Sequence, residues 1–129
     1  MIFSWVSFTS KLMDIEFYES INGRKYVEKY LDKLPINTRK KIVKTLELIE
    51  EEGLSSLKQL GKFIKLRNKK VDLYELRFYI NKIWYRIFCI IYNSKCWLLH
   101  IFDKKSNDTP ERHIETAENR ALEIMYKNY

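Results

Sequence analysis

The sequence predicts an α+β fold, in which an N-terminal helical hairpin packs on a mainly antiparallel twisted sheet and a C-terminal helix follows. Between residues 73 and 105, three runs rich in Ile, Tyr, Phe and Trp are separated by two short polar segments that suit hairpin turns. Residues 27–49 repeat apolar side chains at helical spacing, and so does the segment after residue 109.

Residues 1–12 are predicted to be an N-terminal extension or an apolar arm, and residues 13–129 a single domain. The first segment is apolar, but it lacks the basic start and the cleavage site of a signal peptide. Met13 begins a more ordinary N-terminal sequence. No apolar run reaches the roughly 18 residues that a membrane-spanning helix needs.

The helical hairpin is predicted to follow a first strand at residues 14–18. Its first helix ends at Pro35, and its second runs from an N-cap near Asn37 to a stop at Gly53. The side chains expected to face inward are Val27, Tyr30, Leu31, Leu34, Ile42, Leu46 and Ile49. The second helix begins with a basic outer face, which is either a solvated surface or a contact for a partner: Arg39, Lys40, Lys41 and Lys44.

A basic segment at residues 54–71 precedes the strands and contains no acidic residue. Its cations are Lys58, Lys62, Lys65, Arg67, Lys69 and Lys70. The segment is predicted to be a loop that follows a phosphate backbone, or simply a flexible basic loop. The formal net charge of +7 favours a polyanionic partner, with nucleic acid first and an acidic protein second.

A two-residue turn at 81–82 would place Ile80 opposite Ile83 and Arg77 opposite Arg86. Glu75 then shares a face with both arginines, because directly paired residues lie on one side of a sheet. The opposite face is predicted to meet the core: Tyr74, Leu76, Phe78, Ile80, Ile83, Tyr85, Ile87 and Cys89.

A three-residue loop at 93–95 would pair Phe88 with His100 and Trp84 with Lys104. His100 and Lys104 then join the arginine face, which leaves Trp97, Leu99 and Ile101 on the apolar face. Beyond the last strand, Thr109 and Pro110 suit the start of the C-terminal helix. The buried stripe of that helix, against the sheet or another chain, is predicted to be Ile114, Ala117, Ala121 and Ile124.

The arginine face permits two interpretations. Two arginines directly opposite one another repel, which indicates a face that grips an anion, with Glu75 and His100 available for proton transfer. The same pattern is typical of a solvated outer face of an antiparallel sheet. The two cysteines form no CxxC motif, which favours a reduced, cytoplasmic protein. With two histidines, no metal site is expected, and no other cofactor.

The segments LYELRF, WYRIF and LLHIFDKKSNDTP, followed by Glu115, Ala117 and Arg120, resemble the HigB-like toxins of the RelE/ParE superfamily, phage-derived relatives included. The resemblance runs in order from about Asp14 to the C-terminus. It implies a RelE-like fold and a type II toxin: a metal-independent endoribonuclease, or mRNA interferase, that inhibits translation by cleaving mRNA, typically on the ribosome. It also implies neutralisation by a helix-turn-helix antitoxin in a hetero-oligomeric complex.

The resemblance also suggests site residues. Arg77 and Arg86 match the family's basic sheet-face positions, and Lys104 and Lys105 match its basic pair after the last strand. Glu75 stands where some RelE-type members carry a basic residue. The family's late catalytic tyrosine has no obvious counterpart unless Tyr126 or Tyr129 folds back.

The predicted mechanism is attack of the substrate's own 2′-hydroxyl on the adjacent phosphate. Arg86 and Arg77 would stabilise the phosphoryl charge, which requires both side chains to be reachable on one face. Lys104 and Lys105 would hold flanking phosphates, and Lys104 is a candidate proton donor. His100 is a better candidate base than Glu75, whose pKa two guanidiniums would lower. The RNA-binding residues would be Lys65, Arg67, Lys69, Lys70 and Trp84, which either stacks on a base or packs on the sheet.

Two alternatives remain open from the sequence. A non-nuclease toxin of the same superfamily could bind and poison DNA gyrase. A phage-derived domain could also keep the fold and lose toxicity, against which the retained cations Arg77, Arg86 and Lys105 argue.

Overall fold

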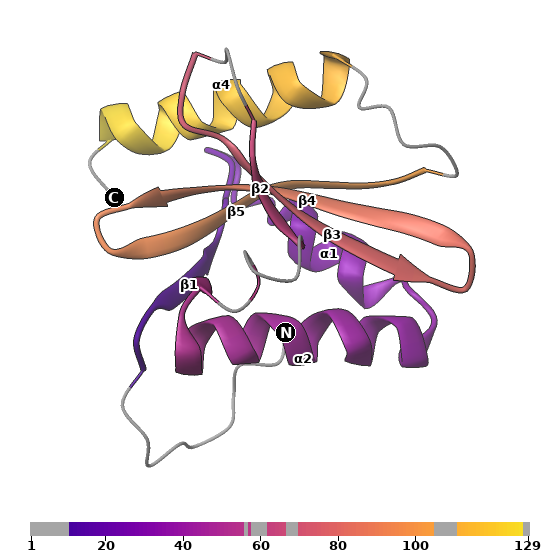
Figure 1. The fold of residues 1–129 in the computed structure, drawn as a ribbon. Coiled ribbons are helices and arrows are strands. Elements are labelled where there is room, and N and C mark those ends of the chain that lie inside the picture. The colour runs from indigo at the N-terminus through magenta and orange to yellow at the C-terminus, as the bar shows by residue number, and fades with distance from the viewer. Residues whose placement is uncertain (1–10, 56, 58–61, 67–69, 105–110, 128–129) are drawn as a thin grey trace.

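The computed structural model describes residues 11–55, 57, 62–66, 70–104 and 111–127. In this part of the chain a five-stranded mixed sheet lies between helices on both of its faces (Figure 1). The elements in order are β1 (Asp14–Phe17), α1 (Tyr26–Asp32), α2 (Ile36–Glu52), β2 (Phe63–Lys65), β3 (Tyr74–Ile80), β4 (Ile83–Tyr92), β5 (Lys95–Lys104) and α4 (Glu111–Lys127).

The sheet has the strand order β1-β5-β4-β3-β2. β1 pairs with β5 in parallel, and the three other pairings are antiparallel. The α+β class and the mainly antiparallel sheet are therefore confirmed. β2 was not predicted: it lies inside the basic segment 54–71, where Phe63 pairs with Leu76, so that segment is not a loop throughout. A strand of three residues is too short to show an alternating pattern.

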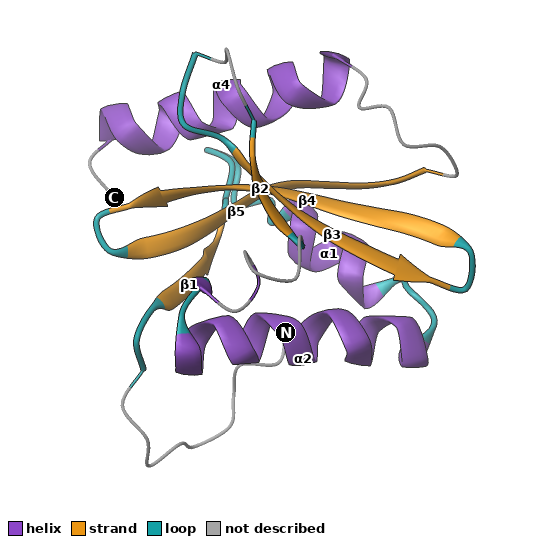
Figure 2. Ribbon diagram, in the orientation of Figure 1, coloured by secondary structure: helices purple, strands orange, loops and turns teal. Residues whose placement is uncertain are grey.

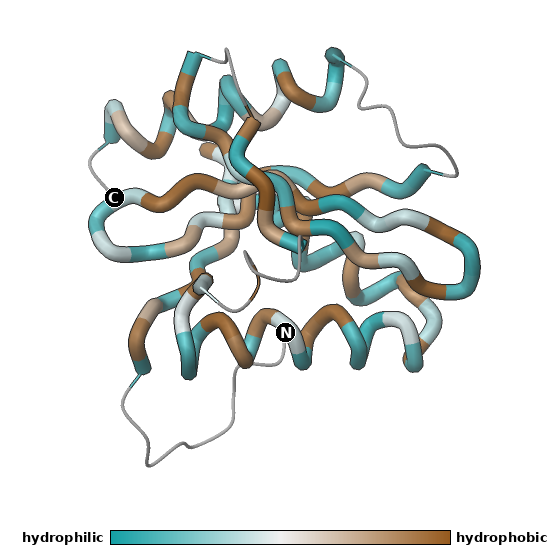
Figure 3. Tube along the Cα trace, viewed as in Figure 1, coloured by the Kyte–Doolittle hydropathy of each residue, from teal (hydrophilic) through white to brown (hydrophobic). Residues whose placement is uncertain are grey.

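The two faces of the sheet are covered by different helices (Figure 2). The first core joins α1 and α2 to the face of Leu76, Tyr85 and Ile87, which is the face predicted to be apolar. The second core joins α4 to the opposite face through Phe88, Leu99 and Phe102. Apolar residues accordingly recur along the sheet strands and both long helices (Figure 3).

The helix predictions are largely confirmed. Ile42, Leu46 and Ile49 of α2 are fully buried, although the helix begins directly after Pro35 and Asn37 is not its cap. The predicted stripe of α4 is buried against the sheet: Ile114, Ala117, Ala121 and Ile124. Thr109 and Pro110 lie outside the described residues. Since α4 covers the face that carries the arginines, that face is not a wet outer surface along its whole length.

The first hairpin has the predicted register, with Arg77 opposite Arg86 and Ile80 opposite Ile83. Its turn residues Asn81 and Lys82 both have positive φ, 52° and 65°, as a type I′ turn requires. This register places the two arginines on one face of adjacent strands.

The second hairpin corrects the predicted turn. It closes with a two-residue turn at 93–94, so Tyr92 pairs with Lys95. A register shift between Phe88 and Cys89 then restores the predicted pairing of Phe88 with His100. The prediction for Trp97 and Leu99 was wrong: both belong to the second core, on the α4 side. Ile101 belongs to the first core, as predicted.

Candidate functional site

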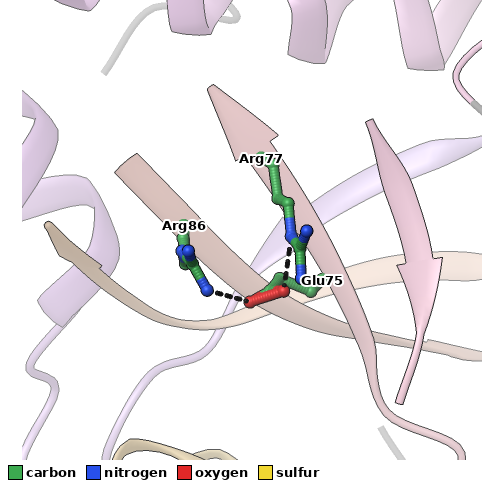
Figure 4. A network of polar contacts seen from close by, with 3 residues as sticks. All are labelled: Glu75, Arg77 and Arg86. Atoms are coloured by element: carbon green, nitrogen blue, oxygen red, sulfur yellow. Dashed lines mark hydrogen bonds and ion pairs between the residues drawn. The ribbon is translucent and has the colours of Figure 1, made fainter. Parts of the chain in front are cut away.

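Glu75 lies between two arginines on the α4 side of the sheet (Figure 4). One carboxylate oxygen accepts a hydrogen bond from Nε of Arg77 at 2.9 Å. The other forms an ion pair with Nη1 of Arg86 at 3.5 Å. Glu75 and Arg77 share a face because they are two residues apart on β3, and Arg86 joins them from the paired position on β4. The predicted placement of the two arginines opposite one another, on the face of Glu75, is therefore confirmed.

Arg86 is nevertheless sealed inside the protein. Its side chain and that of Glu75 are both 0% exposed, whereas the Arg77 side chain keeps 31% of its surface. The burial follows from the second core, in which Phe88 and Phe102 pack beside this cluster under α4. The predicted contact of Arg86 with a substrate phosphate is thus wrong for this arrangement, and so is a role for Glu75 as a general base that touches substrate.

Arg77 lines a cleft of about 490 Å³ between α2, the approach to β2 and the hairpin of β3 and β4. The other lining residues are Lys41, Thr45, Lys62, Phe78, Tyr79, Ile80 and Trp84. Three of the lining residues are cationic and none is acidic. Such a lining attracts a polyanion.

Two aromatic rings stand beside these cations. Tyr79 is 59% exposed, and its ring centroid lies 4.8 Å from that of Trp84 in a tilted arrangement. Cations interleaved with aromatic rings suit single-stranded nucleic acid, since phosphates contact the former and bases stack on the latter. Trp84 was a candidate from the sequence; Lys41, Lys62 and Tyr79 were not singled out as site residues.

His100 is held in a hydrogen-bonded pair rather than presented to the cleft. Its Nε2 lies 2.7 Å from Nδ1 of His113 on α4, and its Nδ1 lies 3.5 Å from Nη1 of Arg120. Burial, followed by the charges of Arg120 and His113, lowers the pKa of His100 to about 4. A group with that pKa is a weak base near neutrality, which argues against the predicted role.

The remaining predicted residues are spread over the surface. Lys104 pairs with Trp84 across β4 and β5, so the two residues share a face of the sheet, but Lys104 is not among the residues that line the cleft. Lys65 is exposed and forms an ion pair with Asp72 at 3.4 Å. Lys70 is exposed, and its backbone N–H donates to Glu118. Lys105, Arg67 and Lys69 lie outside the described residues.

Two further residues of the resemblance lie on α4. The guanidinium of Arg120 stands over the rings of Tyr18 and Tyr26, at 5.1 and 4.5 Å, and donates to the Leu99 carbonyl at 2.7 Å. Arg120 therefore links α4 to β5 through this hydrogen bond. Tyr126 is 82% exposed and does not fold back onto the sheet, and Tyr129 lies outside the described residues.

Among the described residues, no group of three or more His, Cys, Asp or Glu side chains is arranged to hold a metal ion. Cys89 and Cys96 are both buried and free. None of the helices in the described ranges combines the length and the apolarity that crossing a bilayer requires.

The comparisons with known proteins place the chain in a family. A comparison with curated proteins finds no match. Residues 29–122 match the family described as "Phage derived protein Gp49-like (DUF891)", and this segment contains every described residue of the cleft and of the Glu75 cluster. The chain therefore belongs to the Gp49-like family of phage-derived proteins, a family of RelE/HigB-type toxins from toxin–antitoxin systems.

Proposed function

We propose that this chain is a HigB-like endoribonuclease toxin that binds single-stranded mRNA in the cleft of Arg77 and cleaves it on the translating ribosome without a metal ion. The observation that carries the proposal is the lining of that cleft. It combines Lys41, Lys62 and Arg77 with the rings of Tyr79 and Trp84. Membership of a toxin family adds support, since toxins of this type generally act as nucleases on mRNA.

The reaction is attack of the substrate's own 2′-hydroxyl on the neighbouring phosphorus. The bond from the 2′-oxygen to phosphorus forms and the bond from phosphorus to the 5′-oxygen breaks, which yields a 2′,3′-cyclic phosphate and a 5′-hydroxyl end. The 2′-hydroxyl loses one proton and the 5′-oxygen gains one. Solvent water in the open cleft can carry both protons.

Arg77 stabilises the negative charge that builds on the phosphoryl oxygens. An arginine has five N–H donors, and Glu75 takes the one on Nε. The remaining donors form the planar fork that matches two phosphate oxygens. A fixed cation of this kind in an enzyme site contributes about 3 kcal/mol to the barrier reduction, judged from the removal of single oxyanion donors.

Lys41, Lys62 and Lys104 hold the flanking phosphates, and Tyr79 with Trp84 stacks on an unpaired base. The partner that silences the toxin is proposed to be a helix-turn-helix antitoxin in a hetero-oligomer, as the resemblance implies. An acidic segment of that antitoxin would complement the net charge of +7.

The burial of Arg86 and the low pKa of His100 favour one rival, a toxin that poisons DNA gyrase by binding alone. The test is to treat the purified protein with EDTA, remove the chelator, incubate the protein with programmed ribosomes in magnesium buffer, and examine the mRNA ends. Our proposal expects new 5′-hydroxyl ends and matching 2′,3′-cyclic phosphates. Intact mRNA, together with a DNA-damage response when the chain is expressed, would instead establish the gyrase poison.

A further inference from the structure

We infer that Glu75 and Arg86 form a positioning device for Arg77, in which the buried arginine fixes the carboxylate and the carboxylate fixes the cation of the cleft. This inference rests on the proposed function for its catalytic consequence, but its structural part stands apart from it. Neither Glu75 nor Arg86 is placed where it can touch substrate, since both side chains are 0% exposed.

The geometry gives each oxygen of Glu75 its own arginine. Oε1 accepts from Nε of Arg77 at 2.9 Å, and Oε2 faces Nη1 of Arg86 at 3.5 Å (Figure 4). Nε is the guanidinium nitrogen that is bonded to the aliphatic part of the side chain. A hydrogen bond at this atom therefore restricts the rotation of the guanidinium plane and leaves the four Nη donors of Arg77 outside the contact with Glu75.

The burial explains why two arginines are needed. A fully buried carboxylate is unfavourable unless charge and hydrogen bonds compensate it, and a partner that is partly exposed to water compensates it weakly. Arg86, itself sealed beneath α4, supplies a cation that neither solvent nor substrate competes for. Binding of a phosphate to Arg77 then leaves the carboxylate paired with Arg86, so the cluster does not have to rearrange when substrate arrives.

The repulsion of two directly opposed arginines also finds its explanation here. Such a pair is unfavourable by itself. With Glu75 on the same face the cluster becomes cation, anion, cation, and each arginine faces an oxygen of opposite charge. The strands thus hold a cationic group at a fixed place beside the cleft.

Three variants test the device. The first is the double variant Glu75→Leu/Arg86→Met, which removes the buried pair without leaving an unpaired buried charge, a change that proteins often tolerate. The second is Arg77→Met, and the third combines all three substitutions. The matched control is Glu16→Gln/Lys95→Met, which removes the ion pair between β1 and β5, 3.9 Å long, without touching the cleft.

The structural readout is the NMR order parameter of the Nε–H group of Arg77, assigned by its loss in Arg77→Met. We expect a value close to that of rigid backbone groups, about 0.85, in the wild type and the control, and a value below about 0.6 in the double variant. If the order parameter of Arg77 is as low in the wild type as in the double variant, or as high in the double variant as in the wild type, the inference is overturned. This holds whether or not the protein cleaves RNA.

The kinetic readout is single-turnover cleavage of mRNA. Misplacement of a catalytic group by about 1 Å can cost about 100-fold, so we expect a loss of that order in the maximal single-turnover rate constant of the double variant. The enzyme concentration that gives half of that rate should change little. Because the device acts through Arg77, the triple variant should be no slower than Arg77→Met alone. Additive losses, or full activity of the double variant, refute the catalytic role. A wild type with a rigid Arg77 and no cleavage refutes the nuclease and leaves the positioning intact.

Discussion

At the scale of single residues, Arg86 shows why a charge in a sheet strand cannot be read as a ligand contact from its register alone. The sequence predicts correctly that Arg86 lies opposite Arg77 on the face of Glu75. Burial decides its role, and burial depends on α4, which arrives from a distant part of the chain. A signal was present: Phe88 and Ile90 follow on the same face of β4, and a strand that is apolar on both faces indicates cover on both.

The first prediction concerns the stability that this buried charge provides. Arg86→Met removes the buried one of the two arginines that flank Glu75, and the partly exposed Arg77 remains. Because the carboxylate is buried, this change should lower the free energy of unfolding by about 3 kcal/mol. Urea denaturation measures the change. The double variant Glu75→Leu/Arg86→Met should recover to within about 1 kcal/mol of the wild type. An equally large loss in the double variant would mean that the ion pair itself stabilises the fold.

The second prediction concerns pH. His100 has a pKa of about 4 in the folded protein, below its ordinary value of 6.5, so the unfolded chain binds its proton first as the pH falls. The free energy of unfolding should therefore decrease as the pH falls from 6.5 to 4. In the variant His100→Asn, the free energy of unfolding should depend less steeply on pH over this range. Urea titrations across this range provide the measurement.

His113 complicates that slope, because burial and nearby Arg112 also lower its pKa. The control is therefore His113→Asn, compared with His100→Asn and with the double variant. A wild-type stability that stays flat between pH 6.5 and pH 4 contradicts the assignment of a neutral, buried His100.

At the scale of elements, the hairpins separate what the sequence could predict from what it could not. Strong alternation along β3 and β4 and the polar pair Asn81-Lys82 determined the first register. In the second hairpin, Asn93-Ser94-Lys95 suited two loop lengths, and the shift beside Cys89 leaves no mark in the sequence. The two deviations cancel beyond that point, so the predicted pairing of Trp84 with Lys104 is confirmed although the predicted turn was wrong.

The site was harder to predict than the sheet for a related reason. The cleft draws Lys41 from α2 and Lys62 from the approach to β2, and each belongs to a run of similar lysines in the sequence. Only the packing of α2 against the first core decides which lysine of that helix lines the cleft. The periodicity of apolar residues predicts which face of a helix is buried. It does not predict which neighbouring element the residues at the edge of that face contact.

The third prediction belongs to the hairpin turn. Lys82 adopts a φ of 65°, a left-handed conformation that costs a residue with a side chain about 1 kcal/mol and costs glycine much less. Lys82→Gly creates the Asn-Gly sequence that type I′ turns prefer, so the melting temperature should rise by about 4 °C. Lys82→Val is the opposing control and should lower it. A glycine variant that melts below the wild type would contradict the assigned turn.

At the scale of the whole molecule, the net charge of +7 does not by itself identify a site. The distribution of the charged residues over the surface is more informative. The cleft gathers three cations and has no acidic residue in its lining, although Arg77 is paired with Glu75 beside it. Lys65 and Lys95, elsewhere on the surface, are also paired with acids. A polyanion that enters the cleft should therefore release counterions mainly there.

The fourth prediction follows from that distribution. For a single strand, each phosphate that a cation neutralises adds about 0.7 to the slope of log affinity against log salt. Lys41→Met/Lys62→Met should reduce the slope by about 1.4, measured by fluorescence anisotropy with a short unpaired RNA. The matched control is Lys40→Met/Lys44→Met, which removes the same charge from α2 outside the cleft lining. Equal changes in the two variants would mean that RNA does not use this cleft.

The most direct test of the nuclease account is the rate at which Arg77→Met cleaves mRNA on programmed ribosomes. Arg24→Met serves as the control, since it removes the same charge from an exposed position outside the cleft. We predict that cleavage by Arg77→Met falls by at least about 100-fold while the control retains the wild-type rate. Wild-type cleavage by Arg77→Met would contradict the account, because no phosphate would then depend on the one arginine that the Glu75 cluster presents to the cleft.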